Sequence, residues 1–188
     1  MVCVSSSIRR RIAVMVLAGA TLIPIPCAAL FDAFLDVPGI PGESTAPEAP
    51  GQIDVISFGS SVTPSRSVGT ACGAKSGKIV NSFFVSKQID KASPKLFLAA
   101  AQGTNFATVT LRLFKPDPTT GSPVNYVTIT LSNAVVSSIN GGGVHSDDPQ
   151  ETVTFAYAAI QYDYAKPGGG PAGVSSAAWT TNCKAPAQ

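Results

Sequence analysis

One stretch of this sequence, residues 90–103 (DKASPKLFLAAAQG), predicts a short helix whose two ends are both marked. The side-chain oxygen of Ser93 can accept from the first free backbone N–H groups of a helix, so we expect Ser93 to be the N-cap. Pro94 would then occupy the first helical position, where its missing N–H costs nothing. Strong helix formers follow, and Gly103 supplies the stop. The helix caps are therefore expected at Ser93, Pro94 and Gly103.

Apolar runs on both sides of this helix predict short strands. In residues 53–58, and again near Ala158-Ala159, the alternation of apolar residues shifts by one position, so the apolar side chains move to the other face of the strand. Such a phase change requires a bulge, a bend or one strand that serves two sheets. A single Ala-rich helix without a helical partner must plug the end or side of a sheet or barrel. We predict a mainly-β fold, a two-sheet β-barrel or sandwich of about eight to nine strands with one short helix. The expected strands are residues 31–37, 53–58, 79–86, 106–114, 126–131, 135–139 and 152–164.

The first 29 residues have the pattern of a cleavable export signal. Arg9, Arg10 and Arg11 form a basic region, and residues 12–25 are mostly apolar. Small residues then precede Leu30, so we expect cleavage there. The apolar stretch is short for a membrane span, and we expect no stable membrane insertion after cleavage. The mature protein is expected to be secreted, extracellular or periplasmic.

The 188 residues less these 29 leave 159, enough chain for one domain with a real core. Ten basic and eleven acidic residues remain, and no basic patch suggests nucleic acid as a partner. Charged residues make up 13% of the sequence. Interface cores are depleted of charge, so this low fraction favours extensive contact between subunits.

Residues 59–78 are the longest predicted loop, rich in Gly, Ser, Thr and Pro. Loops of this length in compact domains are usually functional or disordered. Cys72 lies in this loop and Cys183 near the C-terminus, and thiols of an exported chain tend to pair. A bond within one chain would close a loop of about 110 residues and stabilise it by several kcal/mol. A bridge between chains is equally compatible with the spacing.

The sequence offers little chemistry. His145, the single histidine, lies in a Gly- and Asp-rich loop, which we interpret as solvated because a metal site needs more ligands at suitable spacing. Asp147, Asp148 and Glu151 lack the alternating oxygen ligands of a calcium loop. No serine lies in a nucleophile-elbow pattern. We therefore expect no catalytic residue, no metal, no cofactor and no enzymatic activity.

From Phe31 to about Tyr164, the order of segments resembles the haemolysin-coregulated protein (Hcp) family, the tube protein of type VI secretion systems. The segment with the helix is the most diagnostic, because a capped helix and its flanking strands occur together. The matching segments are FLDVPGIPGEST, GQIDVISF, IDKASPKLFLAAAQG, YVTITLSNAVVSSINGGG and ETVTFAYAAIQYDY.

This resemblance implies a β-barrel with one helix whose copies assemble into hexameric rings. The rings would stack into a hollow tube that is expelled with a spike protein and carries effectors. It implies assembly and transport rather than catalysis. The long loop would reach toward neighbouring subunits, and the residues expected to make this contact are Gly59, Ser60, Pro64, Arg66, Lys75 and Lys78.

We thus divide the chain into a signal peptide (1–29), an Hcp-like β-barrel domain (30–165) and a flexible C-terminal tail (166–188). The export signal and the tail are departures from the family pattern. A rival interpretation is therefore a secreted binding module, adhesin or fibre subunit that keeps the barrel and serves no contractile machine. A cysteine bridge between Cys72 and Cys183 of different subunits would give covalent adhesion between rings.

Overall fold

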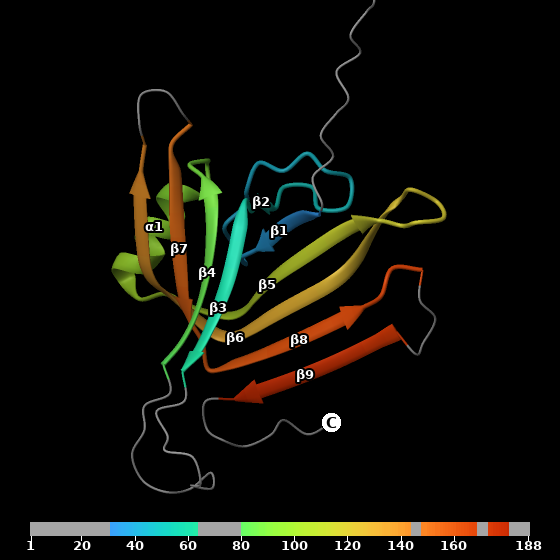
Figure 1. The fold of residues 1–188 in the computed structure, drawn as a ribbon. Helices are drawn as coiled ribbons and strands as arrows, with labels where there is room; N and C mark the ends of the chain where they lie inside the picture. The colour runs from blue at the N-terminus through green and yellow to red at the C-terminus, as the bar shows by residue number, and fades with distance from the viewer. Residues whose placement is uncertain (1–30, 64–79, 144–147, 169–172, 181–188) are drawn as a thin grey trace, which may run out of the picture.

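The computed structural model describes residues 31–63, 80–143, 148–168 and 173–180, and within them the chain forms nine strands and one helix (Figure 1). This confirms the prediction of a mainly-β fold with one short helix. The elements in chain order are β1 (Asp32–Asp36), β2 (Ile53–Asp54), β3 (Ser57–Thr63), β4 (Val80–Gln88), α1 (Ser93–Gln102), β5 (Asn105–Pro116), β6 (Pro123–Gly142), β7 (Gln150–Ala156), β8 (Ala159–Ala165) and β9 (Val174–Thr180).

All nine strands belong to one antiparallel sheet rather than to two separate sheets. The main path runs β2-β1-β5-β6-β7-β4-β3, and β8 and β9 branch from it at β6. The described strands do not close into a barrel, so that part of the prediction is wrong. Among the described strands, β2 and β3 end the main path and do not pair with each other, so the sheet stays open. β6 pairs with β5 and β8 in one half of the sheet and with β7 in the other, and it joins the two halves (Figure 1).

The twenty residues of β6 pair with β5 on one edge and with both β7 and β8 on the other. The sequence predicted two strands here, 126–131 and 135–139, because Asn133 interrupts the alternation. Asn133 adopts a positive φ of 49°, which redirects the strand without ending it. The predicted long strand 152–164 is instead two strands, β7 and β8, and the phase change near Ala158 marks the point where one ends and the other begins.

The other predicted phase change, in residues 53–58, also marks a change of partner. β2 pairs with β1, whereas β3 pairs with β4 at the far end of the main path. Val55 and Ile56 connect the two strands. A single predicted strand is therefore divided between the two halves of the sheet, which explains why its apolar residues point first to one face and then to the other.

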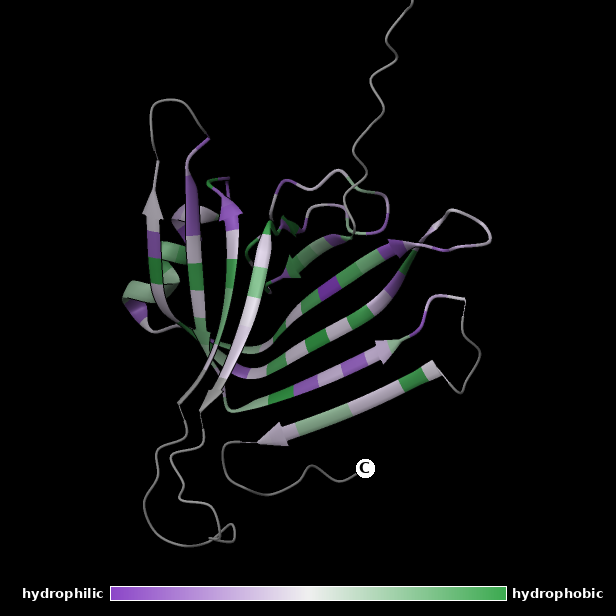
Figure 2. Ribbon diagram, viewed as in Figure 1, coloured by the Kyte–Doolittle hydropathy of each residue, from purple (hydrophilic) through white to green (hydrophobic). Residues whose placement is uncertain are grey.

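The inner faces of both halves pack around one apolar core. Phe83, Val85, Val153 and Phe155 contribute from β4 and β7, while β5 and β6 contribute residues such as Leu111. Figure 2 shows the result along the strands, where hydrophobic bands alternate with polar ones. This period of two is the pattern expected of strands with one buried face.

Helix α1 packs on this core through one face. Leu96 and Ala99, which are about one helical turn apart, are buried there. Gly103 lies at the C-cap in the left-handed conformation, with φ of 64°. Ser93 is the first helical residue and not the N-cap, so that prediction is wrong. The N-cap position is Ala92, Pro94 follows Ser93 inside the first turn, and the Ser93 hydroxyl bonds to other partners.

Two further predictions are corrected by strands that are longer than expected. Gly59 and Ser60 lie in β3 and not in the long loop, because β3 pairs with β4 as far as Thr63 and Val80. The tail predicted from residue 166 contains β9, which pairs with β8 along its whole length. Small residues such as Ala177 hide the alternation of β9 in the sequence.

Candidate functional site

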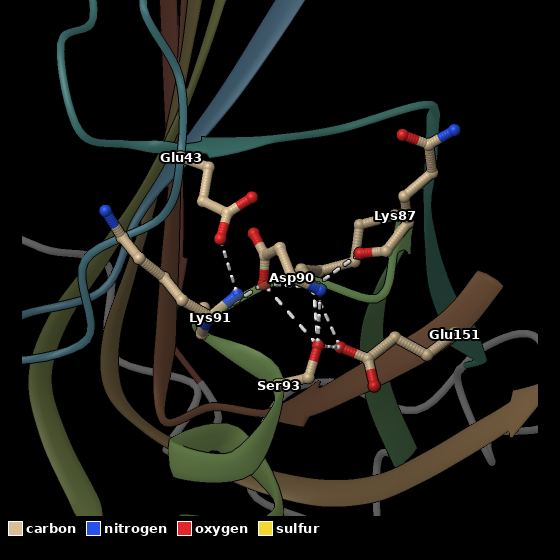
Figure 3. Close-up of polar contacts among 8 residues, drawn as sticks. Glu43, Lys87, Asp90, Lys91, Ser93 and Glu151 are labelled. Atoms are coloured by element: carbon tan, nitrogen blue, oxygen red, sulfur yellow. Dashed lines mark hydrogen bonds and ion pairs between the residues drawn. The ribbon is translucent and has the colours of Figure 1, made fainter. Parts of the chain in front are cut away.

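The most deeply buried charge among the described residues is Lys87, whose side chain is inaccessible to solvent (Figure 3). β4 brings it against the start of α1 and against β7. Its Nζ donates to Oδ1 of Asp90 at 2.7 Å, to Oε1 of Glu151 at 2.9 Å and to Oγ of Ser93 at 3.0 Å. A buried ammonium needs such paired and hydrogen-bonded surroundings, because desolvation otherwise disfavours its charge.

The Ser93 hydroxyl completes this cluster, which we call the lysine cluster (Lys87, Asp90, Ser93 and Glu151). It donates to Oε1 of Glu151 at 2.7 Å and accepts from the backbone N–H of Asp90 at 3.0 Å. The Asp90 carboxylate in turn accepts from the N–H of Ala92 at 2.8 Å. The lysine cluster therefore fixes the first turn of α1 to β4 and β7, and it is a structural anchor for the helix.

The outer face of β3, β4, β7 and the C-terminal part of β6 forms a second feature, which we call the polar wall. Residues directly opposite one another in antiparallel strands share a face. This face carries hydroxyl and amide side chains, no charged residue, and one half-exposed aromatic ring. Its residues are Ser57, Gly59, Ser61, Ser82, Phe84, Ser86, Ser138, Asn140, Thr152 and Thr154.

Both edges of the polar wall are open within the described residues. β3 pairs with β4 alone, and the part of β6 from Val136 to Gly142 pairs with β7 alone. An open edge presents unpaired backbone N–H and C=O groups that can bind another strand. Neither edge carries a charged residue that would discourage such pairing.

A third feature is a cleft of about 560 Å³ between β1, β2 and the loop that joins them. We call it the acidic cleft, because four carboxylates and no basic side chain line it. The apolar part of its wall includes Phe34 and Ile56. The acidic residues that line the cleft are Asp32, Glu43, Glu48 and Asp54.

Asp54, which lines the acidic cleft, has a raised pKa. Burial raises the pKa of Asp54 above its usual 3.8, a hydrogen bond from Ser44 opposes this, and the charges of Asp90, Asp32 and Glu43 raise it further. Folded protein therefore binds this proton more tightly than unfolded protein does.

Replacing Asp54 with asparagine should therefore flatten the pH dependence of stability. The contribution of Asp54 to stability is full below pH 3.8 and is lost as the pH rises through the raised folded value. The variant should lose this decline, and at neutral pH its melting temperature should be slightly above that of the wild type. Thermal unfolding between pH 3 and 7 measures the effect. A steeper decline in D54N than in the wild type would contradict it.

The structure describes some of the predicted site residues, and the others lie outside the described residues. Gly59 and Ser60 lie in β3, where Gly59 belongs to the polar wall, and Glu151 accepts hydrogen bonds from Lys87 and Ser93. Asp148 accepts from the Gln88 side chain at 3.3 Å. The other residues singled out lie outside the described residues: Pro64, Arg66, Cys72, Lys75, Lys78, His145, Asp147 and Cys183.

Sequence reasoning missed Lys87. The signal was present, because a lysine directly follows the strand predicted over residues 79–86, three residues before Asp90 and six before Ser93. Its partner Glu151 is 64 residues away in the sequence, and only the pairing of β4 with β7 brings the two together.

No helix in the described part of the chain is long and apolar enough to cross a membrane. In the same ranges, no three residues among His, Cys, Asp and Glu lie close enough to hold a metal ion.

Comparison with known proteins then identifies the family. The model of the family described as "Type VI secretion system effector, Hcp" matches residues 34–164. The chain belongs to the Hcp family. The match begins in β1 and ends in β8, so it includes the lysine cluster, the polar wall and most of the acidic cleft, while β9 lies beyond it.

Individual Hcp proteins agree with this assignment. Protein hcp1 of Pseudomonas aeruginosa is 31% identical over 135 residues, which cover 71% of this chain and 82% of that protein. A crystal structure of a type VI secretion system effector from Yersinia pestis superposes with a TM-score of 0.64 at 25% identity, covering 79% of this chain and 99% of that one. For Hcp1 from Salmonella typhimurium the TM-score is 0.68 at 23% identity, with 84% and 99% covered, which supports the fold.

The lysine cluster lies in the same segments that indicated the Hcp family in the sequence. Asp90 and Ser93 belong to the helix segment IDKASPKLFLAAAQG, and Glu151 begins the segment ETVTFAYAAIQYDY. The residues that made the helix segment recognisable therefore include the ones that attach this helix to the sheet. The chain is an Hcp tube protein of the type VI secretion system.

Proposed function

We propose that this Hcp chain assembles into hexameric rings that stack into a hollow tube, and that the polar wall lines the lumen. The observation that carries this proposal is a sheet face without charge between two open strand edges. Pairing of one copy's β3 edge with the β6 edge of the next would continue the sheet from subunit to subunit. An uncharged hydroxyl surface binds a passing protein weakly, which suits a conduit.

The proposed activity is assembly and transport rather than catalysis. The family assignment supports copies of itself as the first partner, and a spike protein and effector proteins as further partners. We also infer that residues 1–29 act as an export signal, so that the mature protein is secreted or periplasmic. The Hcp-like domain would then span residues 30–165, followed by residues 166–188. Cys72 and Cys183 would pair in the oxidising compartment, within one chain or between chains.

Electron microscopy of the purified secreted protein tests the assembly, and six-membered rings or stacked tubes are the expected result. The lumen assignment needs a second measurement. In a C72S/C183S background, Ser82→Cys places a thiol on the polar wall and Lys95→Cys places a matched thiol on α1. A small maleimide should label both, whereas a maleimide on a large polymer should label assembled S82C at least about tenfold more slowly than K95C.

The outcome against the proposal is equally clear. A monodisperse monomer at high protein concentration would favour the secreted binding module or adhesin instead. Equal labelling of both thiols by the large reagent in assembled protein would remove the polar wall from the lumen while leaving ring formation in place.

A further inference from the structure

Helix α1 carries apolar side chains on two faces. One face is buried in the core of its own subunit through Leu96 and Ala99. On the other, Phe97 is 67% exposed and Leu98 is 53% exposed. Two more exposed residues lie on this outer face at the spacing i, i+3, i+4, i+7 of one helical stripe. We call it the helix stripe, and its residues are Pro94, Phe97, Leu98 and Ala101. The outer face of a surface helix is ordinarily polar, so the helix stripe indicates a contact that one subunit does not make by itself.

A second apolar surface lies on β8 and β9, where the inner face of the sheet extends beyond the core. Ile129 of β6 is buried, Tyr162 lies opposite it on β8, and Ala177 lies opposite Tyr162 on β9, so the three share a face. Tyr162 and Tyr164 are nevertheless 39% and 40% exposed, because the described part of the subunit covers them only in part. We call this surface the sheet patch, and its residues are Ile160, Tyr162, Tyr164, Ala177 and Trp179.

The helix stripe and the sheet patch fit each other in size and shape. An α-helix is about 10 Å across with its side chains and neighbouring strands are about 4.8 Å apart, so one helix covers a pair of strands. β8 contributes large side chains to the patch, whereas β9 places the small Ala177 beside Tyr162. This step leaves room for the Phe97 ring against the edge of Tyr162, an arrangement that aromatic pairs prefer. The tyrosine hydroxyls can remain in water at the rim of such a contact.

One subunit cannot bring its own helix stripe onto its own sheet patch. Figure 1 shows α1 next to β7 and the C-terminal part of β6, whereas β8 and β9 extend away on the other side of the molecule. The lysine cluster fixes α1 to β4 and β7, and β8 is paired with β6, so neither element is free to reach the other. Two complementary surfaces on different sides of one chain favour a heterologous contact, which closes into a ring when the rotation between copies allows it.

We propose that the helix stripe of one copy packs on the sheet patch of its neighbour in the ring. This inference rests on the proposed function, in which one copy's β3 edge pairs with the next copy's β6 edge. α1 contacts β6, at the end of the polar wall opposite β3. That pairing therefore brings the neighbour's α1 to the β3 side of the first copy, where β8 and β9 lie in Figure 1. The strand edges join the polar wall from copy to copy, and the helix closes the apolar layer behind it.

Polar substitutions on each surface test its part in the ring. Phe97→Gln with Leu98→Gln changes the helix stripe, and Tyr162→Thr with Tyr164→Thr changes the sheet patch. Each double variant should raise the protein concentration needed for half-maximal ring formation by about tenfold or more, because it removes apolar area from the contact. Sedimentation velocity and electron microscopy measure the ring fraction, and melting temperature checks the fold.

Matched controls change the same elements outside the two surfaces. Lys95→Gln with Gln102→Ala alters two exposed residues of α1 that are not in the helix stripe. Gln161→Thr with Ala178→Thr alters an opposing pair on the outer face of β8 and β9. Both controls should form rings at the concentration of the unaltered protein, and an equal loss in the controls would show that the two surfaces have no special part in assembly.

A disulfide bridge identifies which surface meets the helix stripe. In the C72S/C183S background, Ala101→Cys and Ala177→Cys are made singly, and an equimolar mixture under mild oxidation should give a bridged dimer. Neither variant should give this dimer alone, because the contact joins unlike surfaces. The chain with both cysteines should give a ladder of bridged species that ends at six copies. Lys95→Cys mixed with Ala177→Cys is the matched control and should bridge at least about tenfold more slowly.

Each other outcome overturns the inference in a distinguishable way. Rings of F97Q/L98Q that form at the unaltered concentration show that the helix stripe is not a ring contact, while the proposed function stands. Rings without the bridge between A101C and A177C place another surface or another molecule on the helix stripe. A bridge within a single chain shows that the two surfaces meet inside one subunit. If the unaltered protein forms no rings at all, the proposed function itself fails.

Discussion

Replacing Lys87 with methionine is expected to lower the free energy of unfolding by about 3–5 kcal/mol. The ammonium is fully buried and contacts Asp90, Ser93 and Glu151, and Glu151 is itself nearly inaccessible to solvent. Methionine is unbranched like lysine and one atom shorter, and it leaves the Glu151 carboxylate buried without a cation. Urea or guanidinium unfolding at one protein concentration measures the loss.

Two variants show whether charge or packing causes this loss. Lys95→Met removes an exposed lysine of α1 and should change stability by less than about 0.5 kcal/mol. The double variant K87M/E151L removes both charges of the buried pair and should recover part of the stability, since apolar residues of similar volume replace such pairs well. A K87M protein as stable as K95M would show that the lysine cluster contributes nothing to the fold.

Replacing Phe83 with alanine should cost a similar amount, about 3–5 kcal/mol. Phe83 is fully buried and lies directly opposite Phe155, which is also fully buried, at the centre of the half-sheet that carries the polar wall. Truncation removes apolar contact area and leaves a cavity between two packed strands that cannot collapse to fill it. The free energy of unfolding again measures the effect.

The adjacent residue is the matched control. Phe84 is next to Phe83 in β4 but points to the outer face, where it is 39% exposed and its ring covers Gly59. Phe84→Ala should therefore cost about 1 kcal/mol or less, because much of its ring is already in water. A larger loss for Phe84→Ala than for Phe83→Ala would mean that the inner and outer faces of this half-sheet are assigned the wrong way round.

The sequence was sufficient for the parts of the fold that depend on local signals. The alternation in residues 106–114 predicted β5, and the Ala-rich stretch before Gly103 predicted the helix and its stop. Ser93 was assigned to the wrong position because an N-cap is inferred from residue type alone. Asp90 and Glu151 compete for the same hydroxyl, and Glu151 comes from a strand 58 residues further along the chain.

The features that depend on strand pairing could not be predicted in this way. Phase changes near Val55 and Ala158 gave the places where the chain changes partner, but not which partner it takes. β9 was missed because Ser and Ala residues alternate too weakly to mark a face. The acidic cleft was missed because Asp32 and Glu48 are separated by a loop and meet only when β1 and β2 pair.

The shared strand β6 has a consequence for how a subunit loses its structure. The same twenty residues supply backbone partners to β5, β7 and β8, so neither half of the sheet has a complete set of partners without the other. Removing β6 from one half removes it from both. Melting should therefore be an all-or-none event with no half-ordered species between the two end states.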